Sequence, residues 1–409
     1  MPATYSVGID LGTTNSVLAR TPVGGEASRP EVLPVAQLTA PGTIERLPLL
    51  PSFVYLGTPD EVEREAFRLP WGNPSSATGE WARRRAAEVP TRSISAAKSW
   101  LAYGGADRRA AILPWNAPPE VSRISPVEAS RLYLEHLLAA WAEAHPNAPI
   151  AEQQVVLTVP ASFDAVAREL TREAALAAGL PGNFLLLEEP QAAFYAWIAD
   201  QEESWRQQVR EGDVILICDV GGGTTDLSLV GVTQEAGELV LQRLAVGSHV
   251  LVGGDNMDLA LAHMAHARFA EKGVELDPWQ SVALWHACRE AKERLLAPDG
   301  PDSAPVTVLG RGRRLVGGTM SIELTRREVI DALAEGFFPA CGLDAKPARR
   351  AASGFRELGL PFESDPAVTR HLAHFLSQHG DVRPTRVLFN GGVFKSGILA
   401  QRVMDTIND

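Results

Sequence analysis

Apolar and polar positions follow two periods in the first half of the chain, one typical of strands and one typical of helices. Short apolar runs bounded by Gly, Pro or polar residues predict buried strands, and apolar positions three or four apart predict amphipathic helices. A strand followed by a helix, repeated at this spacing, indicates a parallel sheet covered by helices. We expect strands at 5–10, 16–20, 49–55, 155–159 and 184–187, and helices at 80–88, 126–144, 164–178 and 191–198.

Three stretches of the first half lack such a period. Residues 21–48 are rich in Pro and Gly and are expected to be connections, and residues 58–90 are mostly polar. The arginine triplet Arg83–Arg85 is expected to form a solvated helix face. Polar residues 199–213 are expected to link the two halves.

The second half opens as the first does, with a strand, a glycine turn and a hairpin partner. Another glycine turn at 252–255 leads into a helix, and Thr325 is expected to cap a later one. Residues 339–366 look irregular. We expect strands at 214–218, 227–232, 239–246, 306–315, 320–324 and 386–390, and helices at 255–272, 279–296, 325–334, 366–378 and 398–407.

Each half begins with a strand that ends in an Asp followed by glycines and threonines. A missing Cβ lets backbone N–H groups approach phosphate oxygens closely, and hydroxyls add donors. A carboxylate repels phosphate but can hold hydrated Mg²⁺ against it. Two unrelated hairpin turns are the simpler alternative. The residues concerned are Asp10, Gly12, Thr13 and Thr14 in the first turn, and Asp219, Gly221, Gly222, Gly223, Thr224 and Thr225 in the second.

Composition narrows the class of protein. The 409 residues predict two or more domains, and 45% hydrophobic residues support large cores. A net charge of −12 argues against binding to nucleic acid or to anionic membranes. Three scattered cysteines, of which Cys218 is expected in a core, suggest a reducing compartment. We therefore expect a cytoplasmic protein without a membrane span.

The motifs resemble those of the 70-kilodalton heat-shock chaperones of the DnaK type. Residues 8–16 and 219–226 are similar to the two phosphate loops of that family, and residues 159–163, 188–193 and 252–258 match it in order and spacing. The resemblance covers most of the chain and is weak at 21–48, 58–90 and 339–380. It implies an α/β, actin-like ATPase fold of two lobes. Each lobe would have a mixed sheet flanked by helices and a smaller inserted subdomain, with nucleotide in the central cleft.

The resemblance also implies a division of the chain. Lobe I would comprise residues 1–212, with a subdomain inserted at about 37–122. Lobe II would comprise residues 213–409, with a subdomain inserted at about 255–325. A C-terminal return segment, an interdomain linker and a peptide-binding domain are expected to be absent from this chain.

Site roles follow from the same resemblance. Lys98 matches a lysine that reaches the γ-phosphate, and Asp10, Glu189 and Asp219 would surround Mg²⁺ mostly through water. Lys98, Glu189, Asp219 and Thr224 would be catalytic. The residues that would bind ATP or ADP are Gly12, Thr13, Thr14, Gly221, Gly222, Gly223, Thr225, Gly253, Gly254, Lys292, Gly391 and Gly392.

Two further features of the chain bear on nucleotide binding. Pro160 and Arg168 match a switch that reports the nucleotide state in the family. The helix expected at 279–296 corresponds to the one that contacts adenosine in the family, and it departs from the family pattern. Arg289 replaces a ribose-binding Glu, and Glu293 and Leu296 are also unusual. Because a carboxylate stacks poorly on a base, these changes put base recognition in doubt. The segment 393–395 after the second diglycine differs as well.

The leading hypothesis is a Mg²⁺-dependent ATPase domain of a chaperone, a monomer working with a J-domain co-chaperone and an exchange factor. Peptide clients would bind through the absent domain. One alternative is a regulatory, exchange-factor-like module that holds nucleotide with little hydrolysis. Another is a small-molecule kinase, whose base would be Asp164, Glu188 or Glu189. A filament-forming protein is a further alternative.

Overall fold

Two units of secondary structure follow one another along the chain, one built from Met1–Val209 and one beginning at Arg210. The computed structural model describes residues 2–24, 29–115, 117–201, 204–235, 238–310, 318–348, 363–380 and 382–408. Among these residues, each helix is too short or too polar to cross a membrane. The inserted subdomains proposed from the sequence stay predictions.

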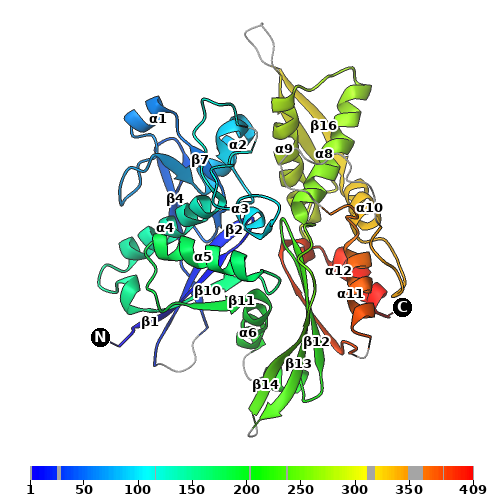
Figure 1. The fold of residues 1–409 in the computed structure, drawn as a ribbon. Helices are drawn as coiled ribbons and strands as arrows, with labels where there is room; N and C mark the ends of the chain where they lie inside the picture. The colour runs from blue at the N-terminus through cyan, green and yellow to red at the C-terminus, as the bar shows by residue number, and fades with distance from the viewer. Residues whose placement is uncertain are drawn as a thin grey trace. The chain divides into compact units, whose positions relative to one another are not determined.

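The first unit is organised around a sheet of six strands in the order β11-β10-β1-β2-β3, with β6 also beside β2. β1 is parallel to β10 and antiparallel to β2, and β10 is parallel to β11. Helices α4 and α5 lie side by side against this sheet (Figure 1). The strands are β1 (Tyr5–Leu11), β2 (Asn15–Pro22), β3 (Glu31–Val32), β6 (Leu50–Pro51), β10 (Gln154–Val159) and β11 (Leu185–Glu188).

The helices of this unit agree with the predicted apolar spacing. Leu134, Leu137 and Trp141 of α4 are fully buried against Val7 and Leu157 of the sheet. Residues 199–213, expected to be a linker, instead contain the end of α6 and the short helix α7. The helices are α3 (Ala97–Ala102), α4 (Pro126–Ala144), α5 (Ala165–Ala177), α6 (Glu189–Gln201) and α7 (Trp205–Gln208).

The expectation that residues 21–48 are only connections is wrong. They include the hairpin of β4 (Val35–Ala40) and β5 (Thr43–Leu47). Residues of β5 are almost all exposed, so the segment carries no apolar alternation that sequence reading could detect. The single strand expected at 49–55 is in fact two, β6 and β7 (Val54–Leu56).

A separate small core lies around β7 and α2. Leu38, Phe53, Tyr55 and Phe67 are buried there together. A three-stranded sheet in the order β8-β7-β9 and helix α2 surround it. Its remaining elements are α1 (Pro59–Glu63), β8 (Ser76–Thr78), α2 (Glu80–Glu88) and β9 (Ser93–Ile94).

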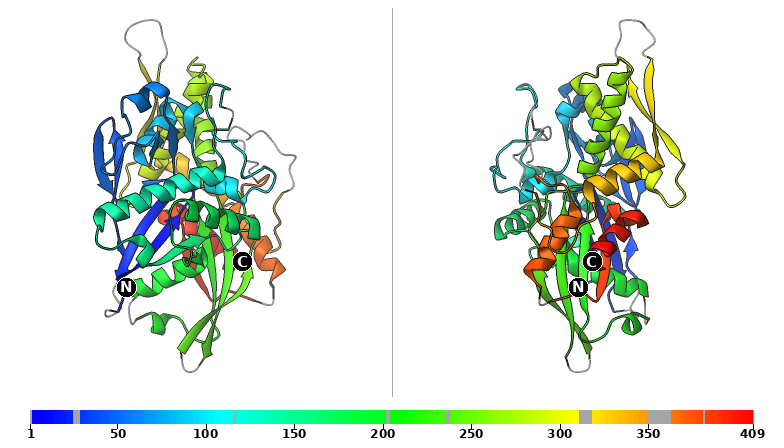
Figure 2. Two further views of the ribbon diagram at one scale, coloured as in Figure 1. Left: turned by 60° about the vertical axis from the view of Figure 1, so that its left-hand side comes forward. Right: turned by 90° about the vertical axis from the view of Figure 1, so that its right-hand side faces the viewer.

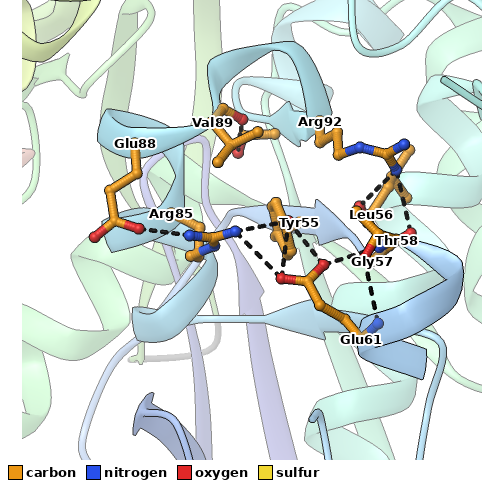
Figure 3. Close-up of polar contacts among 10 residues, drawn as sticks. Tyr55, Leu56, Gly57, Thr58, Glu61, Arg85, Glu88, Val89 and Arg92 are labelled. Atoms are coloured by element: carbon orange, nitrogen blue, oxygen red, sulfur yellow. Dashed lines mark hydrogen bonds and ion pairs between the residues drawn. The ribbon is translucent and has the colours of Figure 1, made fainter. Parts of the chain in front are cut away.

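One arginine of the triplet contradicts the expectation of a solvated face. The Arg85 guanidinium lies 4.7 Å from the centre of the Tyr55 ring and donates to the Tyr55 hydroxyl and to Glu61 (Figure 3). The Tyr55 hydroxyl in turn donates to Glu61. Arg83 and Arg84 instead pair with Glu80 at the start of α2. The helix therefore directs Arg85 inward, where it joins α2 to α1.

The second unit has a four-stranded sheet in the order β14-β13-β12-β17. β12 pairs antiparallel with β13 and parallel with β17. Helix α11 packs on β13 and beside α12 (Figure 1), and Figure 2 shows α11 in orange next to the green strands. The elements are β12 (Val214–Val220), β13 (Thr225–Glu235), β14 (Glu238–Val246), β17 (Arg386–Asn390), α11 (Val368–Gln378) and α12 (Gly397–Asn408).

A second group of elements in this unit packs around two long helices. The predicted cap is confirmed, because the Thr325 side chain accepts a hydrogen bond from the Glu328 N–H. The end of the strand expected at 306–315, and part of the irregular segment 339–366, fall outside the described residues. The elements are α8 (Gly254–Glu271), α9 (Pro278–Leu296), β15 (Ser303–Leu309), β16 (Thr319–Thr325) and α10 (Arg326–Phe337).

Candidate functional site

The first glycine turn connects β1 to β2 and is held in place by Ser52. The Ser52 hydroxyl donates to the Gly12 carbonyl at 2.8 Å, and the Ser52 N–H donates to the Thr14 carbonyl at 2.8 Å. A Cβ on Gly12 would lie 2.2 Å from the Asn15 carbonyl oxygen, so the turn requires glycine there. Sequence reasoning missed Ser52, because 36 residues separate it from its other partner, Ser16.

The Thr14 hydroxyl is shielded from solvent and has no hydrogen-bond partner within the described ranges. An orphaned buried hydroxyl is uncommon in proteins and is explained by a polar ligand or an ordered water. Thr13 and Gly12 beside it are partly exposed. The turn therefore offers a polar group that the protein itself does not satisfy, as a phosphate-binding loop would.

Asp10, near the end of β1, is exposed and oriented by the neighbouring parallel strand. The Thr158 hydroxyl on β10 donates to Asp10 Oδ1 at 2.6 Å. A hydrogen bond from a hydroxyl restricts the rotamer of the carboxylate that accepts it. The carboxylate at this strand end is therefore suited to hold a hydrated cation.

Lys98 and Glu189, which are 91 residues apart in sequence, meet in the first unit. The Lys98 Nζ lies 2.5 Å from Glu189 Oε1, and the two side chains are 12% and 16% exposed. Lys98 is the second residue of α3, and Glu189 is the first of α6, directly after β11. Ala96 enters α3 in a left-handed conformation (φ 54°), which a non-glycine residue seldom adopts. The structure thus brings together two residues of the predicted catalytic set.

Arg168 on α5 contacts both Glu188, the last residue of β11, and the segment that follows β10. Its guanidinium donates to Glu188 Oε1 at 2.8 Å and to the Ala161 carbonyl at 3.1 Å, with a longer contact of 3.5 Å to the Pro160 carbonyl. The predicted switch residues Pro160 and Arg168 therefore lie in contact, and Arg168 pairs with Glu188, the residue before Glu189. Their switching role stays a prediction.

The second glycine turn, between β12 and β13, is packed against the start of α8. The Gly221 carbonyl accepts from the Gly254 N–H at 2.9 Å, and the Gly222 carbonyl accepts from the Asp255 N–H at 2.6 Å. A Cβ on Gly253 would lie only 2.6 Å from the Gly222 carbonyl oxygen. Two carbonyls of the turn thus accept hydrogen bonds from α8, and these N–H groups at the start of α8 are directed to the turn rather than to a ligand.

Thr225 has a different place from the one expected of a phosphate ligand. It is fully buried, and its hydroxyl donates to the Val252 carbonyl at 2.8 Å. Its backbone exchanges hydrogen bonds with Val250 as well. Thr225 therefore ties the second glycine turn to the segment before α8, while Thr224 beside it is only partly buried.

Asp219, next to last in β12, is oriented as Asp10 is. The Asn390 amide on the parallel strand β17 donates to Asp219 Oδ2 at 2.8 Å. Gly391 follows with φ +88°, and a Cβ there would lie 2.2 Å from the Val220 carbonyl oxygen. Gly392, by contrast, has open space around its Cα. Sequence reasoning predicted the diglycine and missed Asn390, whose role depends on strand register.

The helix expected to hold adenosine, α9, directs two of its three cations, Arg289 and Lys292, into the protein. The Lys292 Nζ donates to the Gly254 carbonyl at 2.9 Å and lies 2.6 Å from Asp258 Oδ1. Arg289 is 5% exposed, whereas Glu293 is exposed. The Lys292 amine is thus bound to the start of α8, and its contact with a nucleotide stays a prediction.

The described residues contain no cluster of three side chains arranged to hold a metal ion directly. The predicted set divides between the units, with Asp10 and Glu189 in the first and Asp219 in the second. Carboxylates that act singly through water fit Mg²⁺, which keeps several waters and uses few protein ligands.

Comparisons with known proteins identify the family of this chain. Residues 113–338, more than half of the chain, match the family model described as Hsp70 protein. The chain is similar to Chaperone protein HscA homolog of Bordetella pertussis, 34% identical over 367 residues that make up 87% of this chain and 49% of the relative. The relative of the same name from Pseudomonas putida is 34% identical, over 89% of this chain and 50% of the relative.

A third similar relative, Chaperone protein HscA homolog of Acinetobacter baumannii, is 31% identical over 72% of this chain and 42% of the relative. The chain thus spans about half the length of the curated relatives it matches. The resemblance drawn from the two glycine turns is confirmed. The chain belongs to the Hsp70 family, whose nucleotide-binding domain has the actin-like α/β ATPase fold predicted from the sequence.

Proposed function

We propose that this chain binds ATP and ADP together with Mg²⁺ and hydrolyses ATP slowly, as the nucleotide-binding part of a DnaK-type chaperone. The observation that carries the proposal is a repeated arrangement. In each unit an Asp at a strand end receives a hydrogen bond from the parallel neighbouring strand, and a glycine turn held by the protein follows it. Binding of adenine nucleotides by the Hsp70 family supports the assignment.

In this proposal each unit carries one glycine turn that is suited to bind phosphate. The orphaned hydroxyl of Thr14 and the partly buried Thr224 would donate to phosphate oxygens. Asp10 and Asp219 would hold Mg²⁺ mostly through water, and the ion would supply charge neutralisation. Phosphoryl transfer to water needs positioning and neutralisation more than covalent chemistry, which is what these groups provide.

The ion pair of Lys98 and Glu189 gives the proposal its catalytic step. A phosphate that approaches Lys98 competes with Glu189 for the ammonium group. The carboxylate that is released would then accept a hydrogen bond from the attacking water and orient it.

The test is single-turnover hydrolysis of labelled ATP with Mg²⁺. We expect slow turnover in the parent chain and about a 100-fold lower rate constant in Lys98→Ala and Thr224→Ala, because each removes a transition-state contact. Lys272→Ala removes an exposed lysine just past α8 and is the matched control. Parental turnover in Lys98→Ala would contradict the catalytic role of Lys98.

A nucleotide-holding module with little hydrolysis is the second candidate. It is favoured by the closed pair of Lys98 and Glu189 and by Lys292, whose amine contacts the protein itself. Binding without turnover in the parent and in all variants of the test would establish it.

The kinase alternative requires a carboxylate base, and the pairing of its three candidates disfavours it. Asp164 accepts two hydrogen bonds from Arg108, Glu188 pairs with Arg168, and Glu189 pairs with Lys98. A general base must be able to reach a substrate hydroxyl; Asp164 and Glu188 are held by arginines, and Glu189 is assigned here to the attacking water. ATP turnover stimulated by a panel of sugars would reverse this conclusion.

Partners and location belong to the same proposal. A J-domain co-chaperone, an exchange factor and peptide clients are expected from the family resemblance, and a cytoplasmic location is supported by three unpaired cysteines. Pull-down with a J-domain protein, with and without ATP, tests the first of these expectations.

A further inference from the structure

A buried network of two cations and two carboxylates joins α9 to the start of α8. Arg289 Nη2 lies 2.5 Å from Asp255 Oδ1, and Arg289 Nε donates to Asp258 Oδ2 at 2.8 Å. Lys292 Nζ lies 2.6 Å from the other oxygen of Asp258. Asp258 is 1% exposed, Arg289 5% and Lys292 9%. The two positive and two negative charges balance within the network.

This network is continuous with the second glycine turn. The backbone N–H of Asp255 donates to the Gly222 carbonyl at 2.6 Å, and the preceding residue, Gly254, donates to Gly221. Lys292 holds the Gly254 carbonyl from the other side. Trp285 donates from its indole N–H to the Asp255 carbonyl at 3.3 Å. The carbonyls of residues 254 and 255 therefore accept hydrogen bonds from α9, while their N–H groups donate to the glycine turn.

Arginine is the residue type that this position requires. Its planar guanidinium reaches Asp255 and Asp258 through different nitrogens and lies over the Trp285 ring, 5.1 Å from the ring centre. A lysine ammonium has one nitrogen and does not stack in the same way. Burial raises the pKa of Asp255, and the positive charge of Arg289 opposes that rise. Arg289 thus orients Asp255 and opposes the effect of burial on its pKa.

We propose that Arg289 is a positioning residue for nucleotide turnover, which fixes the second glycine turn through Asp255 and the first turn of α8. This inference rests on the proposed ATPase function for its kinetic consequence. It assigns Arg289 a task other than contact with the nucleotide. Its structural consequence, a rigid glycine turn, is measurable without any nucleotide.

The experiment compares Arg289→Lys with the parent chain and with Arg294→Lys, an exposed arginine on the same helix. Amide hydrogen exchange is measured without nucleotide at residues 221–225 and 254–255, with α12 as the reference region. We expect Arg289→Lys to speed exchange in the turn about tenfold, the scale of one lost charge-assisted hydrogen bond. Exchange in α12 and the thermal midpoint should stay close to those of the parent.

Single-turnover hydrolysis then connects the turn to function. The rate constant in Arg289→Lys should fall about tenfold, because a mobile loop holds phosphate less often in the reactive geometry. Asp255→Asn weakens only the ion pair between Arg289 and Asp255 and leaves Asp258 in place. This variant replaces Arg289→Lys if that protein does not fold. It should show the same faster exchange in the turn and the same lower rate constant. Parental exchange and parental turnover in a folded Arg289→Lys or Asp255→Asn protein would overturn the proposal.

The two proposals fail in different ways. If the parent chain neither binds nor hydrolyses ATP, the proposed function is wrong, and the exchange rates still decide whether Arg289 positions the turn. If exchange rises equally in the turn and in α12, Arg289 only stabilises the whole unit and the positioning proposal is wrong.

Discussion

Replacement of Gly253 by Ala tests the contact between the second glycine turn and α8. The backbone of Gly253 is extended (φ −167°), so alanine fits its conformation and only the new methyl group matters. That Cβ would lie 2.6 Å from the Gly222 oxygen and 2.7 Å from the Gly221 oxygen, and both oxygens belong to backbone. The turn must therefore move away from α8.

The size of the effect follows from the bonds that this movement lengthens. The same two oxygens accept the N–H groups of Gly254 and Asp255 at 2.9 and 2.6 Å. At about 0.5–1.5 kcal/mol for each hydrogen bond, the cost is about 1–3 kcal/mol. If ATP binding requires the undistorted turn, affinity should fall roughly 5- to 150-fold.

The assay combines denaturant unfolding with calorimetric titration of ATP and Mg²⁺. The matched control is Gly336→Ala on α10, where a Cβ meets nothing within 4 Å. That change should leave affinity unchanged and stabilise the chain by up to about 1 kcal/mol, because Ala favours a helix over Gly. Parental affinity and parental stability in Gly253→Ala would refute the reasoning, since the turn would then tolerate a methyl group between itself and α8.

Three further predictions concern carboxylates. Asn390→Ala removes the side chain that donates a hydrogen bond to Asp219. We expect the Mg²⁺ concentration that gives half-maximal turnover, measured by titration, to rise about tenfold. An unchanged concentration would show that Asn390 does not orient Asp219. Glu189→Gln should lower the single-turnover rate constant about 100-fold while ATP still binds, and parental turnover would exclude the base role. The hydrogen bond from Arg108 lowers the pKa of Asp164, so its stabilising effect is present above about pH 4 and lost as the pH falls through the lowered pKa. Asp164→Asn should therefore lower the thermal midpoint at pH 7 more than at pH 3, and equal losses would contradict this assignment.

The sequence was sufficient to predict features that depend on short-range chemistry. The Asp at each strand end, the glycines that follow and the Thr325 cap are each determined by a few adjacent residues. Long helices such as α4 and α9 were also predictable, because their apolar residues repeat with a helical period. The predicted fold class is confirmed on this basis and by the family match.

The residues that complete the site were not predictable, because they come from distant parts of the chain. Ser52 supports a turn 40 residues away from it, and Asn390 orients an Asp that precedes it by 171 residues. Their side chains carry no motif, and strand register alone brings them to the site. Thr225 shows the opposite case: its motif predicted a ligand, which stays a prediction, while its buried hydroxyl donates to the Val252 carbonyl.

The two glycine turns have similar chemistry and are supported by different means. Hydroxyl and backbone groups of Ser52 hold the first turn, and a side chain can adjust when its partner shifts by a few tenths of an ångström. Backbone of α8 holds the second, and the helix is in turn fixed by the buried charges of Arg289 and Lys292. Backbone of a packed helix has less freedom of this kind than a side chain. The position of the second turn should therefore depend on α8 and on the charges behind it, and that network belongs to the site as much as the glycines do.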